Sequence, residues 1–237
     1  MTAGFRGSLA ALSASQKSSA GVSLYSRYVN RPLGRVLAAA AASAGLSPNA
    51  VTVLSAAATA GGLVVLIAVP PSWGPAALSA ALLVVGFALD SADGQVARLT
   101  GRGSPAGEWL DHVVDAGKMV AVHGAVLVAA LRHGLLPEPW LYLPLAYQLL
   151  SAVFFAALTI FELLQRQRAG TPAPKRPSTM RAIALLPADY GILAVAFVLW
   201  GWPPLFFVVY AMLFVGTLCI ALALARKWYR TLRDPIR

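Results

Sequence analysis

Residues 76–98 read AALSAALLVVGFALDSADGQVAR. Up to Leu89 the stretch is almost entirely apolar, which is typical of a helix that crosses a membrane. It then changes character, because Asp90, Asp93 and Arg98 follow within little more than two helical turns. Ionisable side chains at the end of a membrane span are costly to bury, so they indicate a functional site as well as a fold.

Similar apolar runs recur along the chain, which has 237 residues, 58% of them hydrophobic and only 12% charged. Soluble domains carry about 25% charged residues, so the composition favours a membrane protein. Six runs approach the ~20 residues that cross a hydrocarbon core. They are Val51–Val69, Ala76–Val96, Trp109–Leu131, Trp140–Leu164, Ile183–Trp200 and Leu205–Ala225. We therefore expect an all-α integral membrane bundle of six transmembrane helices.

The net charge of +10 is distributed unevenly about these runs. Lys and Arg cluster before the first run and after the second, fourth and sixth, whereas the opposite loops hold Arg132 alone, partly offset by Glu138. Cytoplasmic loops carry the excess of basic residues, so we expect a multi-pass protein of the cell membrane with both termini and the acidic site cytoplasmic. The charge flanks apolar runs and forms no continuous patch, which excludes nucleic acid as the expected partner.

The N-terminal region divides into two parts. Residues 1–22 are rich in Ser, Ala and Gly and are expected to be a disordered cytoplasmic tail, followed by one membrane domain over residues 23–237. Apolar residues from Leu24 to Leu37 recur at helical spacing between arginines, which predicts an amphipathic helix lying in the membrane interface and bent at Pro32. Ser47 and Pro48 are expected to cap and begin the first span.

Four aspartates carry the candidate chemistry. Asp90 and Asp93 are three residues apart and Asp111 and Asp115 are four apart, so each pair shares a helix face. Because the connecting stretch Leu99–Ala106 is short, the two helices are expected to present these faces to each other. Four carboxylates together require cations, and oxygen ligands favour Mg²⁺ or Mn²⁺. Two such ions would clamp a phosphoryl group, which predicts a substrate that contains pyrophosphate.

The same residues and their spacing resemble the complete signature of the CDP-alcohol phosphotransferase (CDP-alcohol phosphatidyltransferase) family. The matching positions are Asp90, Asp93, Gly94, Ala97, Arg98, Gly107, Asp111 and Asp115. The resemblance implies that a substituted phosphate group passes from a CDP-alcohol to the hydroxyl of a second alcohol, with release of CMP. It also implies six spans, an N-terminal interfacial helix and a homodimer.

The resemblance further assigns roles by position. Asp90, Asp93 and Asp111 would hold two divalent cations, and Asp115 would be the general base as well as a further metal ligand. Gly94, Ala97 and Arg98 would line the CDP site, and Gly107 would permit close packing beside it. Asn49 and Thr52 match positions that face the nucleotide in relatives.

The acceptor alcohol leaves fewer traces. Candidate acceptor-binding residues are Lys118, Arg176, Arg181 and Asp189. Lys118 has a structural alternative, since it could simply temper the charge of the acidic cluster. The two arginines could equally form a solvated, lipid-facing cluster.

We expect CDP-diacylglycerol as the donor, in phospholipid biosynthesis. Thr159–Arg168 lacks the Tyr-x-x-Ala-Arg-Ala-Glu-like stretch of members that resemble phosphatidylinositol-phosphate synthases, which argues against inositol phosphate as acceptor. A CDP-polyol (CDP-inositol-like) donor is an alternative, making a phosphodiester of soluble polyols or a polyol-phosphate lipid. From another class, the chain could be a non-catalytic membrane protein or a cation-coupled transporter. The complete signature argues against the former, and acids at one rim instead of the bilayer midplane argue against the latter.

Overall fold

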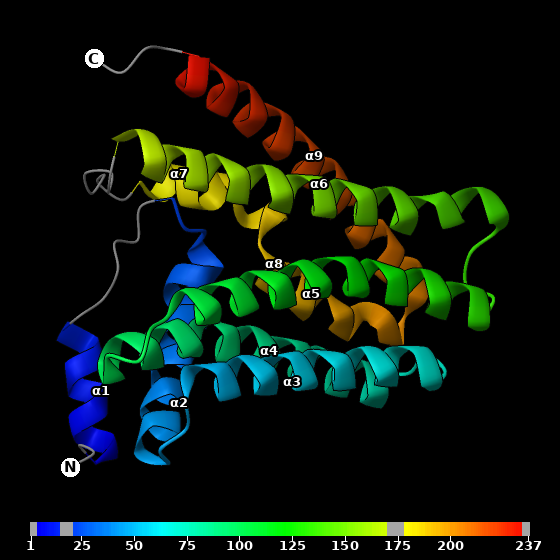
Figure 1. The fold of residues 1–237 in the computed structure, drawn as a ribbon. Coiled ribbons are helices and arrows are strands. Elements are labelled where there is room, and N and C mark those ends of the chain that lie inside the picture. Colours follow the sequence, from blue (N-terminus) through cyan, green and yellow to red (C-terminus); the bar gives the residue numbers. More distant parts are fainter. Residues whose placement is uncertain (1–3, 15–20, 170–177, 234–237) are drawn as a thin grey trace.

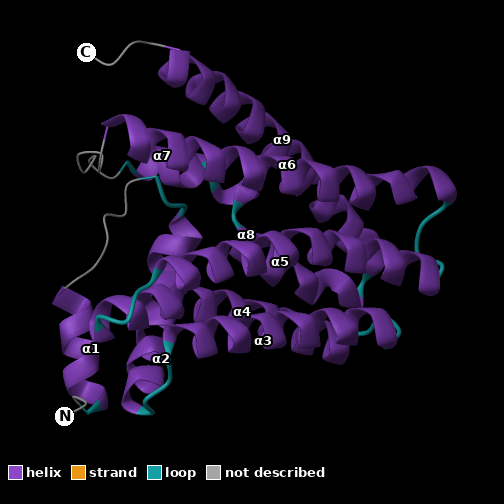
Figure 2. Ribbon diagram, in the orientation of Figure 1, coloured by secondary structure: helices purple, strands orange, loops and turns teal. Residues whose placement is uncertain are grey.

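The computed structural model describes residues 4–14, 21–169 and 178–233. Over these residues the chain forms helices joined by short loops and contains no strand (Figure 2). The all-α class expected from the sequence is thus confirmed.

Five long helices form the body of the molecule (Figure 1). They are α3 (Pro48–Ala68), α4 (Trp73–Thr100), α5 (Pro105–Arg132), α6 (Glu138–Ala169) and α9 (Pro203–Arg233). Each is long and apolar enough to cross a membrane, so the protein is a multi-pass membrane protein. Within the described chain α3 packs closely on both α4 and α5, and α5 packs on α6. The α4–α5 pair is not among the closely packed helix pairs, which leaves room between these two helices.

Small residues let α3 and α4 approach each other. Ser55 Oγ donates a 2.6 Å hydrogen bond to the carbonyl of Gly86, and Ser79 Oγ donates a 2.9 Å bond to that of Gly62. A Cβ atom on Gly86 would lie 2.5 Å from Thr59 Oγ1. Between helices in a membrane, close packing and such hydrogen bonds replace the hydrophobic effect as the source of association.

The expected fifth span, Ile183–Trp200, is not one continuous helix. The chain there forms α7 (Thr179–Ala184), a 3-10 helix (Leu186–Ala188), α8 (Tyr190–Ala196) and a second 3-10 helix (Phe197–Gly201). Pro187 has no N–H to continue a helix, and Asp189 caps α8 by accepting a 2.7 Å hydrogen bond from the Gly191 N–H. The described chain therefore has five long apolar helices and the shorter apolar segment Tyr190–Gly201, where the sequence predicts six spans.

The N-terminal region is also more ordered than expected. A helix, α1 (Phe5–Ala14), lies within residues 1–22, for which the sequence predicts a disordered tail. Leu12 is only 1% exposed and belongs to a small core with α2 (Arg31–Ser43) and α4. The sequence did not predict this helix, because the segment has few large apolar residues that would indicate a buried face.

The helix α2 lies across one end of the bundle that the long helices form (Figure 1). It is preceded by a π-helical turn, Ser26–Asn30. The helix type therefore changes from π to α at Arg31, one residue before Pro32, where the sequence predicts a bend. The predicted start of α3 is confirmed: Ser47 Oγ accepts a 3.2 Å hydrogen bond from the Ala50 N–H, and Pro48 occupies the first turn.

Candidate active site

The turn between α4 and α5 brings the two acidic segments together. The residue that follows α4 is Gly101, which adopts the left-handed conformation (φ 65°) that favours glycine. Three residues later Ser104 caps α5 by accepting a 3.1 Å hydrogen bond from the Gly107 N–H, and Pro105 follows in the first turn. The short loop reverses the chain so that α4 and α5 present their acidic faces to each other.

Three of the four aspartates converge between these helices. One carboxylate oxygen from each of Asp90, Asp111 and Asp115 lies within 4.8 Å of the other two. All three side chains are partly buried. Their ligand atoms are all carboxylate oxygens, the type that a hard divalent cation prefers, so the three residues could hold a metal ion.

The fourth acid, Asp93, is held more rigidly. It is 5% exposed, and one of its oxygens accepts a 2.6 Å hydrogen bond from Thr52 Oγ1 on α3. Its other oxygen accepts a hydrogen bond from the Gly94 N–H. A carboxylate held by such bonds keeps a fixed orientation, which suits a metal ligand or a group that faces a substrate.

Lys118 lies inside the acidic cluster. Its ammonium group donates hydrogen bonds to Asp90, to Asp115 Oδ1 at 3.2 Å and to Ser55 Oγ at 2.9 Å. The side chain is 8% exposed, so the charge is buried together with the carboxylates that balance it. These contacts agree with the structural alternative considered for this lysine, a cation that tempers the acidic cluster.

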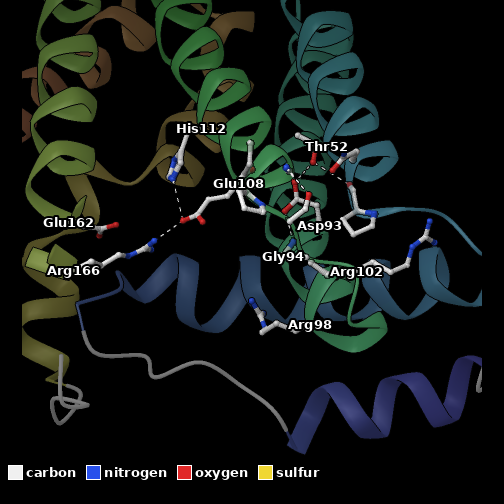
Figure 3. A pocket seen from close by; sticks show the side chains of 17 residues that line it. Thr52, Asp93, Gly94, Arg98, Arg102, Glu108, His112, Glu162 and Arg166 are labelled. Carbon is white, nitrogen blue, oxygen red and sulfur yellow. Dashed lines mark hydrogen bonds and ion pairs between the residues drawn. The ribbon is translucent and has the colours of Figure 1, made fainter. Parts of the chain in front are cut away.

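A cavity of about 720 Å³ opens beside the acids (Figure 3). Asp93 and Asp111 are among the residues that line it. All six residues predicted to form the nucleotide site also line it: Asn49, Thr52, Gly94, Ala97, Arg98 and Gly107. They come from α3, α4 and α5, so the structure brings together residues that are far apart in the sequence.

The two glycines of this cavity have different surroundings. A Cβ atom on Gly107 would lie 3.0 Å from Asn49 Oδ1, so the absence of a side chain there lets α5 approach α3. A Cβ atom on Gly94 would meet nothing closer than Arg98 Nη1 at 3.5 Å, which is ordinary contact. Packing within the protein therefore does not explain glycine at position 94, whereas a ligand lying against this wall would.

The cavity is also lined by charged residues outside the predicted site. Arg166 of α6 donates a 2.7 Å hydrogen bond to Glu108 of α5, and His112 lies 4.0 Å from the same carboxylate oxygen (Figure 3). The ion pair joins residues 58 positions apart, so no local spacing could have revealed it. Arg102 also lines the cavity, on the side formed by the α4–α5 turn.

None of the described acceptor candidates lines this cavity. Lys118 is bound by the acids, and Arg181 lies exposed on α7. Asp189 is buried at the start of α8, where it accepts hydrogen bonds from Ser23 and Ser26 as well as from Gly191. Arg176 lies outside the described residues.

Comparison with known proteins shows which family has this arrangement of residues. A model of the CDP-alcohol phosphatidyltransferase family matches residues 45–228. The match contains all four aspartates and every residue that lines the 720 Å³ cavity. The comparison with curated proteins gave no match.

Proposed function

Because the chain belongs to the CDP-alcohol phosphatidyltransferase family, which transfers a phosphate group from a CDP-alcohol to an acceptor alcohol, we propose that its donor is CDP-diacylglycerol. The reaction would release CMP and serve phospholipid biosynthesis. The observation that carries this proposal is the meeting of an acidic cluster with a cavity of about 720 Å³ at one end of a membrane bundle. A nucleotide can enter such a cavity while the rest of the donor stays in the lipid.

An apolar groove supports a lipid-linked donor. It has a volume of about 330 Å³ and lies between α5 and α6. Ala116 and Val120 line one side, and Phe155 and Ile160 line the other. Ala116 is the neighbour of Asp115 in the chain, so the groove begins close to the acidic cluster. Acyl chains attached to the transferred phosphate would find an apolar surface there.

The acidic residues have the roles of metal ligands in this proposal. Asp90, Asp93 and Asp111, with Asp115 beside them, would hold two divalent cations, Mg²⁺ or Mn²⁺. When bound, such cations neutralise pyrophosphate charge and stabilise the entering and leaving oxygens of the displacement. Thr52 keeps the Asp93 carboxylate in a fixed orientation through its 2.6 Å hydrogen bond.

The remaining residues bind and orient the donor. Asn49 and Thr52 would face the nucleotide, while Gly94 and Ala97 keep the cavity wall low. Arg98 would donate hydrogen bonds to phosphate oxygens. Gly107 has a structural part, because it lets the start of α5 lie against Asn49.

Asp115 would act as the general base. It takes the proton from the acceptor hydroxyl while that oxygen attacks the phosphorus that bears the diacylglycerol. A new phosphorus–oxygen bond forms, the bond to the CMP phosphate breaks, and CMP leaves with the electron pair. The hydrogen bond from Lys118 at 3.2 Å holds Asp115 Oδ1 in place for this step.

The proposal places the protein in the cell membrane with its termini and acidic site on the cytoplasmic side. The α1 helix, the α4–α5 turn and the C-terminal end of α9 lie at the same end of the bundle (Figure 1). The segments at this end are rich in Lys and Arg. We also propose a homodimer, as the resemblance to the family implies.

Release of CMP by the purified full chain tests the function. The protein, in lipid nanodiscs with Mg²⁺ or Mn²⁺, is incubated with CDP-diacylglycerol and, in separate reactions, glycerol phosphate, inositol, inositol phosphate or serine. We expect metal-dependent CMP release with one of these acceptors. CMP release from CDP-inositol but not from CDP-diacylglycerol would replace the proposed donor by a polyol, and no release from any CDP-alcohol would overturn the proposed activity.

A further inference from the structure

A second, smaller cavity lies next to the acidic residues. It has a volume of about 210 Å³, and its walls include Asp90, Asp93 and Asp111. It shares Asp93, Gly94, Arg98 and Asp111 with the larger cavity but contains none of the α3 residues that line the nucleotide side. Asp93 and Asp111 therefore line two spaces, one large enough for a nucleotide and one large enough for a phosphate group.

Arg31 of α2 also lines the smaller cavity. The approach of α2 to α4 depends on Gly34, one turn after Arg31. A Cβ atom on Gly34 would lie 2.8 Å from both Cβ and Oγ of Ser91 and 3.0 Å from the Ala88 carbonyl. Further along α2, Ala38 is fully buried. The close packing of these two helices thus places the guanidinium group of Arg31, a residue outside the signature, at the edge of the acidic cluster.

The smaller cavity is lined by charges of both signs, since two arginines lie beside the three aspartates. Arg31 is half-buried, and burial together with the positive charges of Arg98 and Arg27 lowers the pKa of its guanidinium group. Two arginines from different helices, Arg31 and Arg98, thus face one space at the edge of the site. Guanidinium groups match the oxygens of a phosphate in charge and in geometry.

We propose that Arg31 binds the transferred phosphate group of the donor in this smaller cavity, while the CMP half of the donor occupies the larger one. The inference rests on the proposed function, because it divides a CDP-alcohol between the two spaces. A pyrophosphate that lies across Asp93, Gly94 and Asp111 has one phosphate on each side of their shared wall. Arg98, which lines both cavities, can reach either phosphate, whereas Arg31 reaches only the one that is transferred.

This division predicts that Arg31 distinguishes CDP from CMP. CDP carries the second phosphate that Arg31 would bind, and CMP lacks it. Binding of each nucleotide to the full chain in nanodiscs, with Mn²⁺ present, can be measured by isothermal titration calorimetry without any turnover. For Arg31→Gln we expect the affinity for CDP to fall by about 10- to 100-fold, as for the loss of a charged hydrogen bond. The affinity for CMP should change by less than about 3-fold, which also shows that the variant is folded.

Two further variants sharpen the test. Arg31→Lys keeps the positive charge but lacks the planar guanidinium group, so it should lose less CDP affinity than Arg31→Gln. Arg35→Gln is the matched control, because Arg35 lies one turn further along α2 and contacts Ser13 Oγ at 3.3 Å, away from the cavity. It should bind both nucleotides as the wild type does.

Three outcomes would overturn the inference. One is equal weakening of CDP and CMP in Arg31→Gln, and another is unchanged affinity for both. The third is a loss of CDP affinity in Arg35→Gln as large as in Arg31→Gln, which would reveal a general effect of surface charge. Failure of the wild type to bind either nucleotide would instead overturn the proposed function, and the role of Arg31 with it.

Discussion

Thr52 Oγ1 donates a 2.6 Å hydrogen bond to Oδ2 of Asp93 and so joins α3 to the acidic face of α4. Both side chains are almost fully buried, at 3% and 5% exposed. Thr52 lies outside the family signature, and through this hydrogen bond it orients Asp93, which belongs to the signature.

Replacing Thr52 by Val removes this hydroxyl and keeps the shape of the side chain. Asp93 loses a charged hydrogen bond, so we expect kcat/KM for CMP release to fall by about 10- to 100-fold. Thr52→Ser retains the hydroxyl and should stay within a few-fold of wild type. Equal activity of the Val and Ser variants would show that the hydrogen bond does not orient Asp93 for the reaction.

Asp115→Asn removes the proposed base while preserving size. We expect the rate of CMP release to fall by about 10²- to 10⁴-fold, the usual contribution of general base catalysis. CDP binding should change little by comparison. Glu138→Gln, at the opposite end of the bundle on α6, is the control and should retain full activity. Wild-type turnover by Asp115→Asn would remove Asp115 from the mechanism.

Lys118→Met leaves Asp90 and Asp115 without the buried ammonium group that they share. Removing one partner from a buried ionic cluster typically costs about 3–5 kcal/mol, so the variant should unfold at a lower temperature than wild type in EDTA. Saturating Mn²⁺ supplies replacement positive charge and should narrow the difference. The exposed Lys227, changed to Met, serves as control. If Mn²⁺ leaves the difference in unfolding temperature between variant and wild type unchanged, Lys118 and the cations act on separate parts of the structure.

Gly191→Ala tests how the N-terminal region is held. A Cβ atom at position 191 would overlap the ring of Tyr25, which also stacks on Phe87. Such overpacking typically costs about 1–3 kcal/mol of stability. The double variant Tyr25→Ala, Gly191→Ala should be less destabilised than the sum of the two single variants. Gly117→Ala is the control: a Cβ atom there would meet nothing within 4 Å, so this variant should be neutral or slightly stabilising. If the losses of stability from the Tyr25 and Gly191 variants simply add in the double variant, the contact between these residues is contradicted.

The convergence of the acidic residues was largely predictable, because these residues repeat at helical spacing. Asp111 and Asp115 share a face by the geometry of any α-helix, and the short α4–α5 turn leaves few ways to arrange the two helices. The start of α3 was equally local, because Ser47 and Pro48 provide a cap and a first turn. These predictions required only periodicity and hydrogen-bonding chemistry.

Long-range contacts could not be predicted in the same way. The interruption at Pro187 and Asp189 was masked by the apolar residues on both sides, which give the segment the average composition of a continuous span. Arg166 meets Glu108 across 58 residues. Arg31 reaches the acids only because α2 packs on α4 at Gly34, and the sequence does not state which helix lies opposite a glycine.

The contacts between Asp189 and the serines near the N-terminus bear on the order in which the protein is assembled. Ser23 and Asp189 are separated by 166 residues. At a synthesis rate of about 5–20 residues per second, the ribosome needs about 10–30 seconds to make the intervening chain. During this interval Ser23 and Ser26 lack their partner. The contact that ties the segment before α2 to the start of α8 therefore forms late in biogenesis, after most of the bundle has been synthesised.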